Sequence, residues 1–439
     1  MLSRSSALRT SAALTASALV AVSLAACSSA GNGGDGANAE VTVSVYNEAA
    51  VVKTVTALAE AFQKENPGIT VTVDPRPTGT EGDNLVKTQL STGEMDSVLL
   101  YNSGSLFQAL NPDQTLTDLS GESWAADVSD GFKPVVSTDA GFYGAPLGTS
   151  YAGAVVYNKK VFADLGIEVP KDWASFTAAA AKIKAAGITP VEQTYGDSWT
   201  SQLFVLGDFG NILAQDPQWA EEYTANKAKY ADQPALTSFQ HLQDAFDAGM
   251  FNQDFASATA ADGIAALGSG KAAMYPMLTQ VVLGQLAQDA PDQIADLGVF
   301  PFPADAAADT TLTVWQPSAL YIPKTTEGAQ LDAAKKFIAF ANSSAGCDIQ
   351  NANGNAAGPY VIDTCKVPTD AAPLVSDIAS YVDGGKSASA LEFLSPIKGP
   401  NLENISVEVG SGIRSAADGA AAYDEDVKKQ AQQLGIEGW

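Results

Sequence analysis

Short apolar segments with a two-residue period alternate along this chain with longer segments of helical period. The first, Val-Thr-Val-Ser-Val-Tyr, alternates apolar and polar residues as a half-buried strand does. The expected elements are, in order, a strand over residues 41–46, a helix over 50–66, a strand over 69–73, a helix over 82–92 and a strand over 97–101. This β-α-β-α-β order predicts a parallel sheet with helices on both faces.

The residues that directly follow these strands are the first candidates for ligand contact. In open α/β sheets, ligands bind in the crevice beyond the carboxyl ends of the strands. The residues at those positions are Asn47, Glu48, Arg76, Asn102 and Ser103.

The later part of the chain returns to the same pattern with more helix. Strands are expected over residues 154–157, 272–275, 297–302 and 311–321, and helices over 173–186, 198–213, 235–248, 259–267 and 330–342. These elements form either two domains in series or two lobes that the chain enters more than once, and periodicity alone does not decide between them.

Length and charge narrow the range of functions. The 439 residues suffice for two domains, and 24 Lys plus Arg against 50 Asp plus Glu give a net charge of −26. A field of that sign repels nucleic-acid phosphates, so no nucleic-acid partner is expected. His241 is the only histidine, which excludes His-rich zinc centres, and neither a metal nor a cofactor is expected.

The N-terminus has the pattern of an export signal. Arg4 and Arg9 precede an apolar stretch over residues 12–24 that is too short to span a bilayer. Leu-Ala-Ala-Cys at the end of that stretch resembles a bacterial lipobox, which implies a signal peptide over 1–26 and a lipidated Cys27 on a Gly-rich tether over 27–40. The alternative is an ordinary signal peptide with an incidental cysteine. The protein is expected at the extracellular face of the cell membrane, lipid-anchored.

The other two cysteines are expected to form a disulfide. Cys347 and Cys365 are an even pair in an exported chain, which meets oxidising conditions. The alternative, a reactive thiol, would need a neighbouring base, and His241 is the one histidine available.

Three short motifs suggest chemistry that their context does not support. Residues 268–271 (Gly-Ser-Gly-Lys) lack the spacing of a phosphate loop and are interpreted as a helix end. Residues 395–398 match S-x-x-K, but the partner motifs of that acyl-transfer site are missing. The acidic run over residues 424–426 is interpreted as a solvated helix start.

Aromatic residues at strand ends and loop starts point to a sugar ligand. A sugar ring packs its C–H face on an aromatic plane, and its hydroxyls need amide or carboxylate partners. Trp199 and Trp315 are expected to pack against ligand and not against the core. The aromatic candidates are Tyr101, Tyr151, Trp199 and Trp315, and the polar candidates are Asn47, Glu48, Asn102, Gln280, Asn355 and Glu403.

Five stretches of this chain resemble one known family. They cover residues 143–147, 157–162, 165–173, 268–275 and 298–303. In these stretches the chain resembles the family 1 extracellular solute-binding proteins of sugar ABC importers. It departs from the family pattern at Asp172 and in its cysteine pair. It also departs at residues 276–280, where Pro-Met-Leu-Thr-Gln replaces a Gly-and-Trp sequence.

The resemblance implies an α/β fold of two lobes, the type II periplasmic-binding-protein fold, with three chain crossings near residues 150, 315 and 356. Lobe 1 would be 41–150 plus 316–356, and lobe 2 would be 151–315 plus 357–439. Hinge closure would enclose the ligand between them. Carried over by position, the resemblance places Tyr101, Asn102, Ser103, Tyr151 and Trp315 at the cleft, and Met277 is also expected to contact the ligand.

The expected function is therefore the substrate-binding subunit of an ABC importer, and not an enzyme. Its partners would be a carbohydrate, expected to be an oligosaccharide, the permease subunits, and the membrane through a lipid anchor, with the protein itself a monomer. Two alternatives remain open. One is a secreted glycoside hydrolase, which needs two carboxylates across a cleft. The other is a binding protein for a non-sugar solute such as a polyamine.

Overall fold

Two sheets, each with its own hydrophobic core, organise the computed structural model, which describes residues 39–354 and 356–439. The first sheet has the strand order β2-β1-β3-β12-β6 and the second β13-β11-β7-β9-β8, with β10 paired to β7. We call the two halves lobe 1 and lobe 2. The expected signal peptide, Cys27 and Asn355 lie outside the described residues.

Lobe 1 contains the first βαβαβ unit and two helices from late in the sequence. Its elements are β1 (Ala39–Tyr46), α1 (Ala49–Glu65), β2 (Ile69–Arg76), α2 (Gly79–Thr92), β3 (Val98–Tyr101), α3 (Ser105–Gln108), α4 (Pro112–Thr115), η1 (Ser123–Asp127), η2 (Lys133–Val136), β4 (Ser137–Thr138), β5 (Gly141–Phe142), β6 (Ala145–Pro146), β12 (Ala319–Tyr321), α13 (Gly328–Ala341) and α14 (Ser344–Asn353).

Lobe 2 is richer in helix. Its elements are β7 (Tyr151–Asn158), α5 (Lys159–Leu165), α6 (Trp173–Ala185), β8 (Thr189–Val191), η3 (Ser198–Gln202), α7 (Leu203–Gly207), α8 (Phe209–Gln215), α9 (Trp219–Thr224), α10 (Leu236–Asp247), α11 (Ala260–Gly268), β9 (Ala272–Leu278), α12 (Thr279–Asp289), η4 (Pro291–Asp296), β10 (Leu297–Phe300), β11 (Leu312–Trp315), α15 (Pro373–Asp383), β13 (Ser387–Ser389), η5 (Leu391–Phe393), α16 (Leu402–Gly410) and α17 (Ala416–Gln433).

The first strands pair as the alternation predicts. β1 lies between β2 and β3 and is parallel to both, while β12 joins β3 antiparallel. Helix α1 buries Val55, Leu58, Ala59 and Phe62, which fall on one helical face. The parallel sheet predicted for the start of the chain is confirmed.

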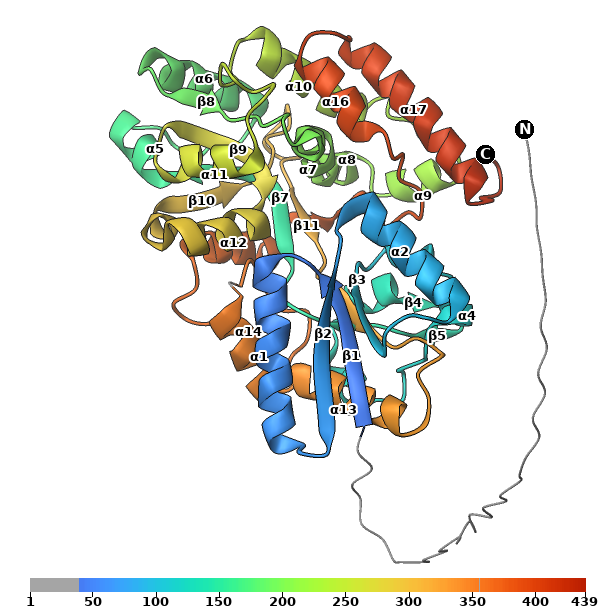
Figure 1. The fold of residues 1–439 in the computed structure, drawn as a ribbon. Coiled ribbons are helices and arrows are strands. Elements are labelled where there is room, and N and C mark those ends of the chain that lie inside the picture. The colour runs from blue at the N-terminus through green and yellow to red at the C-terminus, as the bar shows by residue number, and fades with distance from the viewer. Residues whose placement is uncertain (1–38, 355) are drawn as a thin grey trace, which may run out of the picture. The chain divides into compact units, whose positions relative to one another are not determined.

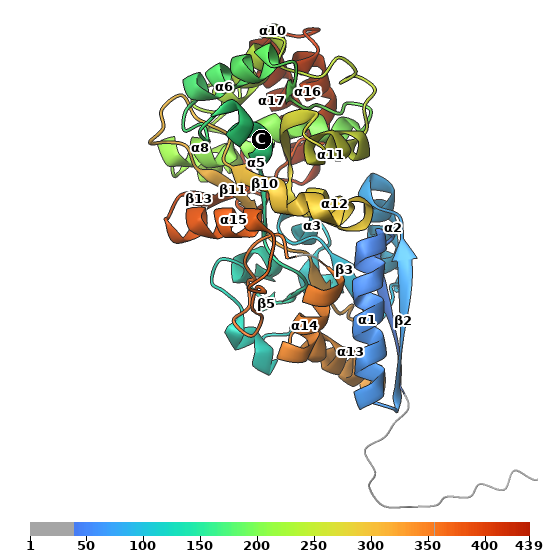
Figure 2. The same ribbon diagram turned by 90° about the vertical axis from the view of Figure 1, so that its left-hand side faces the viewer.

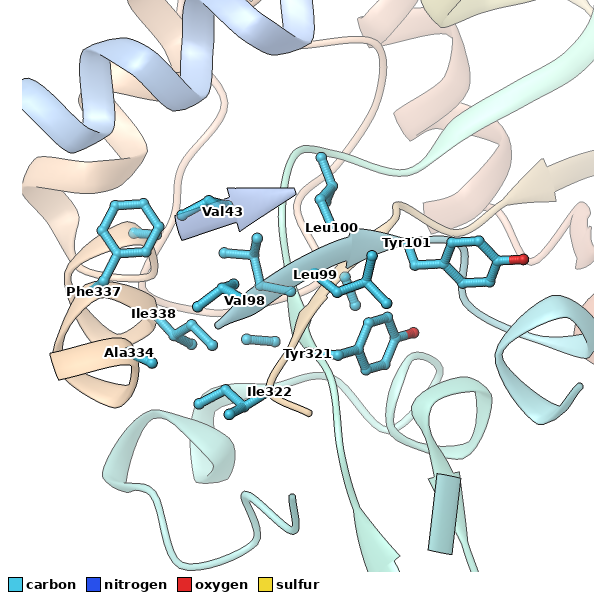
Figure 3. Close-up of a cluster of buried hydrophobic side chains, with 14 of the residues drawn as sticks. Val43, Val98, Leu99, Leu100, Tyr101, Tyr321, Ile322, Ala334, Phe337 and Ile338 are labelled. Carbon is cyan, nitrogen blue, oxygen red and sulfur yellow. The ribbon is translucent and has the colours of Figure 1, made fainter. Parts of the chain in front are cut away.

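The core of lobe 1 brings together residues far apart in the sequence. Val43 and Val98 lie in one cluster with Phe337 and Ile338 of α13 (Figure 3). The Phe62 ring meets the Phe337 ring edge-on, with centroids 5.5 Å apart. Figures 1 and 2 both show α13 and α14 close to α1, although all of β7 to β11 separates them in sequence. The chain therefore enters lobe 1 more than once, which decides the question that periodicity left open.

The strand expected over residues 311–321 is in fact two strands in different sheets. β11 pairs with β7 in lobe 2, whereas β12 pairs with β3 in lobe 1. Pro317 lies between them and has no N–H to donate to a sheet. The segment 316–318 is thus a crossing between the lobes.

The helix expected over residues 198–213 is broken into η3, α7 and α8. The Thr313 hydroxyl donates to the Gly207 carbonyl (2.6 Å) and accepts from the Gly210 N–H (2.8 Å). Both backbone groups would serve hydrogen bonds inside a continuous helix. A side chain inserted into that ladder interrupts the helix.

The third crossing lies further along the chain than residue 356. Ala357 packs with lobe 2, but Val361, Ile362 and Cys365 belong to the core of lobe 1. Cys365 is joined to Cys347 of α14 by a disulfide, with Cα atoms 5.3 Å apart. The bridge holds the chain in lobe 1 until it leaves for α15.

The interpretation of residues 268–271 as a helix end is confirmed, whereas that of residues 424–426 as a helix start is not. Residues 268–271 do end a helix, because α11 stops at Gly268 and Gly270 has a φ of +74°. The acidic run lies instead in the middle of α17, and its interpretation as a helix start is wrong. The Asp424 carboxylate accepts from the backbone N–H groups of Tyr230 (2.8 Å) and Ala231 (2.9 Å), so it holds a neighbouring loop in place.

Within the described residues, no helix is both long enough and apolar enough to cross a membrane.

Candidate functional site

A cavity of about 210 Å³ lies where the end of β3 meets lobe 2. Its walls combine aromatic rings, aliphatic side chains, amides and one ion pair. The lining residues are Asn102, Ser103, Ser105 and Leu106 from lobe 1, Gln316 from the crossing, and Tyr151, Trp199, Gln202, Leu203, Leu206, Leu278, Trp315, Glu392, Phe393 and Lys398 from lobe 2.

Lobe 1 contributes the loop that follows β3. The Ser103 hydroxyl donates to the Pro317 carbonyl (2.9 Å), and the Asn102 carbonyl accepts from the Tyr321 hydroxyl (3.0 Å). These bonds tie the loop to the crossing at 316–318 and to β12. Asn102 and Ser103 line the cavity because they follow a strand whose carboxyl end faces it.

Gly104 allows the two lobes to touch. Its φ of +73° and ψ of −139° suit glycine alone, and a Cβ there would lie 2.5 Å from the Glu392 carbonyl oxygen. The same Cβ would lie 2.7 Å from Cδ1 of Phe393, a side chain that packs against the cores of both lobes. Residues 391–398, which we call the η5 loop, therefore close one side of the cavity.

Trp315 and Tyr151 form an aromatic wall that lobe 2 holds in place. Their rings lie 6.5 Å apart at an angle of 17°. Trp315 is only 5% exposed, and a Cβ at Gly153 would lie 2.3 Å from its indole. The expectation that Trp315 does not pack against the core is wrong, because the indole fills the space that Gly153 leaves open. Trp199 on η3 is half-buried.

The polar groups of the cavity come from several elements. Glu392 and Lys398 form an ion pair within the η5 loop, with Oε2 and Nζ 3.4 Å apart. The Tyr151 hydroxyl is hydrogen-bonded to Gln280, and its pKa is raised by burial and by the nearby Glu392 carboxylate. Gln316 Oε1 is buried and has no hydrogen-bond partner among the described residues. An unpaired buried acceptor is costly, so a ligand hydroxyl that donates to it would be stabilising.

Asn47 and Glu48 follow β1 near this cavity but do not line it. The Glu48 side chain is exposed, yet desolvation by the surrounding protein raises the pKa of its carboxyl. Its charge also contributes to the raised pKa of Tyr151. Asn47 is exposed, and its backbone N–H donates to the Arg76 carbonyl (2.9 Å).

Four other candidates lie away from the cavity wall. Tyr101 is fully buried, with its hydroxyl 2.9 Å from an Asp83 oxygen, and Met277 is fully buried in the core of lobe 2. Arg76 is buried under the Tyr46 ring, 4.6 Å from its centroid. Glu403 is half-buried at the start of α16. Strand-end position therefore does not separate side chains that face the cavity from those that turn into the core.

The η5 loop belongs to the site but is not predicted from the sequence. It follows β13, which pairs in parallel with β11, so both strands end at the same edge of the sheet. The strand-end rule that indicates Trp315 would also have indicated residues 391–398. β13 has only three residues, however, and its Ser-Ala-Ser sequence carries no alternation. Gln202, Leu106, Leu203 and Leu206 lie in helices and Gln316 in a crossing, where the strand-end rule does not apply.

Within residues 39–354 and 356–439, no group of three or more His, Cys, Asp or Glu side chains is arranged to hold a metal ion.

Comparison with known proteins decides the family. Residues 47–346, about two thirds of the chain, match the family model described as bacterial extracellular solute-binding protein. This chain belongs to that family. The match begins directly after β1 and runs into α14, so it spans both lobes and the first two crossings.

A curated relative and several solved structures are similar to this solute-binding protein. The "Multiple sugar-binding protein" of Streptococcus mutans is 24% identical over 307 residues, which are 69% of this chain and 71% of the relative. A "Chitin oligosaccharide binding protein" superposes with a TM-score of 0.77 at 22% identity, covering 90% of this chain and 100% of that one. "SBP RafE in complex with raffinose" superposes with a TM-score of 0.74 at 19% identity, covering 89% and 99%. These similarities establish the two-lobed type II fold.

Proposed function

We propose that this solute-binding protein captures a carbohydrate, expected to be an oligosaccharide, and delivers it to the permease of an ABC importer. The observation that carries the proposal is the cavity itself. It combines flat rings from Tyr151, Trp199 and Trp315 with amide and charged groups around them. Flat rings suit the C–H face of a sugar, and polar groups suit its hydroxyls.

A hinge between the two lobes would allow them to enclose the ligand. Cavity walls come from both lobes, and the first crossing is hydrogen-bonded to α14 and to the segment that follows it. Ser150 donates from its backbone N–H to the Pro359 carbonyl (2.9 Å), and the Gly148 N–H donates to Gln350 Oε1 (2.8 Å). Closure about such a hinge would exclude water and strengthen each hydrogen bond to the ligand.

The residues that line the cavity favour a sugar-binding protein over a glycoside hydrolase or a polyamine-binding protein. Of the described residues that line it, Glu392 alone carries a carboxylate, and Lys398 neutralises it. A glycoside hydrolase needs two carboxyl groups across the scissile bond. A polyamine needs negative charge that is not already paired. We therefore propose binding without hydrolysis, and a ligand that is uncharged overall.

We also propose that the protein acts as a monomer, anchored outside the cell through lipidated Cys27. The lipobox-like sequence ahead of Cys27 and the family's extracellular role support this. In native cells the protein should fractionate with membranes, and Cys27→Ala should release it or leave it unprocessed. A freely soluble, unlipidated wild-type product would contradict the anchor.

Thermal unfolding with a sugar panel tests the proposed function. The panel contains galactose, raffinose, stachyose and chitin oligosaccharides, with spermidine as the non-sugar comparison. A ligand at 100 times its Kd stabilises the folded state by about 2.7 kcal/mol, which raises Tm by a few degrees. At least one sugar should raise Tm and be recovered uncleaved. No response to any sugar, or a response to spermidine alone, would overturn the ligand class.

A further inference from the structure

We propose that the Glu392–Lys398 ion pair sets specificity at this site, by binding hydroxyl groups of an uncharged sugar and rejecting acidic and amino sugars. This inference rests on the proposed function, because it concerns how a carbohydrate in that cavity would be recognised. It goes further by assigning two residues and a charge preference to the site.

The backbone around the pair is held firmly. At the start of the η5 loop, the Ala390 N–H donates to the Val314 carbonyl (3.0 Å), one residue before Trp315. Further along, the Thr224 hydroxyl donates to the Ser395 hydroxyl (2.7 Å), and Ile397 is fully buried. Since both ends are anchored in lobe 2, the two charged side chains start from fixed positions.

Both charged side chains are partly exposed, and the distance between their charged atoms is longer than in a tight ion pair. The Lys398 side chain is 34% exposed and the Glu392 side chain 24%, and both line the cavity. Their N–O distance of 3.4 Å exceeds the about 2.7–2.9 Å of a tight charge-assisted hydrogen bond. A carboxylate only accepts and an ammonium only donates, so together they match two neighbouring hydroxyls, one donating and one accepting.

The pair also balances the charge of the cavity. Among the described lining residues, Glu392 supplies the one negative charge and Lys398 the one positive charge. A uronate would add a second anion, inside a chain whose net charge is −26. An amino sugar would compete with Lys398 for the same carboxylate. Either ligand would leave a charge without a partner once the cavity closes, and an unpaired enclosed charge is costly.

Titration calorimetry with sugars matched in shape and different in charge tests the inference. The probes are the uncharged sugar that raises Tm most in the panel and the corresponding uronic-acid and free-amine sugars. They are titrated into wild type, Lys398→Met, Glu392→Gln and the double variant. Lys160→Met serves as the control, because Lys160 pairs with Asp296 at an exposed site outside the cavity wall.

Wild type should bind the uncharged sugar at least tenfold more tightly than either charged analogue. Lys398→Met should weaken the uncharged sugar about tenfold and shift preference toward the amino sugar, while Glu392→Gln should shift it toward the uronate. The double variant should again disfavour both charged analogues, because neither finds a partner of opposite charge in the cavity, and Lys160→Met should behave as wild type. Unliganded melting temperatures identify any variant that fails to fold, in which case the remaining single variant decides.

Two results would overturn the inference while the proposed function stands. In the first, wild type binds a charged analogue as tightly as the uncharged sugar. In the second, the single variants bind all three sugars more weakly by the same factor, which would make the pair a structural contact of the loop. Wild type that binds no sugar at all would instead overturn the proposed function, and this inference with it.

Discussion

Trp199 and Trp315 line the same cavity but differ in how deeply each is buried. Trp315 is 5% exposed, covers Gly153 and belongs to the core of lobe 2. Trp199 is half-buried and lies on the short helix η3. Both can contact a ligand, but only Trp315 is also a core residue.

Alanine substitution should separate these two roles. Trp315→Ala removes a buried ring and should lower the free energy of unfolding by about 3–5 kcal/mol without ligand. Trp199→Ala should change that free energy by a smaller amount, yet remove most of the rise in Tm that a sugar produces. Urea unfolding and thermal shift, with and without ligand, measure both effects. Equal losses of unliganded stability in the two variants would contradict the distinction.

Asp208 should make the protein less stable as the pH rises. It is buried, and desolvation raises its pKa to about 8. Between its unfolded pKa of about 4 and pH 8, the unfolded state loses this proton while the folded state keeps it. The free energy of unfolding therefore falls with pH, by at most about 1.4 kcal/mol per pH unit from this group.

The variant Asp208→Asn tests that dependence. An amide stays uncharged at every pH, so the fall in stability between pH 5 and pH 8 should be smaller than in wild type. Urea unfolding across this pH range measures the slope. Asp130→Asn is the matched control, because the Asp130 side chain is fully exposed. An unchanged slope in Asp208→Asn would show that Asp208 ionises in the folded protein as it does unfolded.

At the scale of elements, periodicity predicts what local sequence determines. The alternation of 41–46 and the helical period after it give β1 and α1 within a few residues. The strand over 311–321 could not be divided from sequence, because β11 and β12 are both apolar and differ only in their distant partners, β7 and β3. The break after Gly207 likewise depends on Thr313, more than 100 residues away.

For the site, too, the sequence predicts some residues and not others. Strand ends indicate Asn102, Ser103 and Trp315, because the direction of a strand fixes which end faces the crevice. They also indicate Tyr101, which turns into the core of lobe 1, since a strand end does not determine the side-chain direction. The Glu392–Lys398 pair follows a strand whose sequence has no alternation to reveal it.

Gly104 should be needed for the lobes to meet. In Gly104→Ala the new Cβ would collide with the backbone of Glu392, so the η5 loop must move away and ligand affinity should fall about tenfold or more. Gly187→Ala is the control, because Gly187 also has a positive φ, +77°, but nothing within 4 Å of its Cβ position. Both variants place a side chain at positive φ, which costs on the order of 1–3 kcal/mol. Titration calorimetry that finds equal affinities in both variants would exclude the contact as a factor in binding.

The disulfide should stabilise the segment that precedes the third crossing. Cys347 and Cys365 are 18 positions apart, and closing a loop of that size stabilises by about 3 kcal/mol on the chain-entropy model. Cys347→Ser with Cys365→Ser should lower the free energy of unfolding by about that amount. Thiol titration of the denatured, unreduced mature domain should find neither cysteine free. Two free thiols would contradict the bridge.

At the scale of the whole molecule, the two lobes share one binding cavity. Each has its own sheet and core, and the chain passes between them at 147–150, at 316–318 and after Cys365. Residues from both lobes line the cavity, so a ligand there would contact both at once. That arrangement fits the family's role in capturing a solute outside the cell.

A crystal structure of the mature protein with the sugar that raises its Tm most would show directly where the ligand binds. We expect the sugar to lie between the loop after β3 and the η5 loop, with one ring stacked on Trp199 and hydroxyls bonded to Glu392 and Lys398. A sugar bound outside this cavity, or held by residues of one lobe alone, would contradict it.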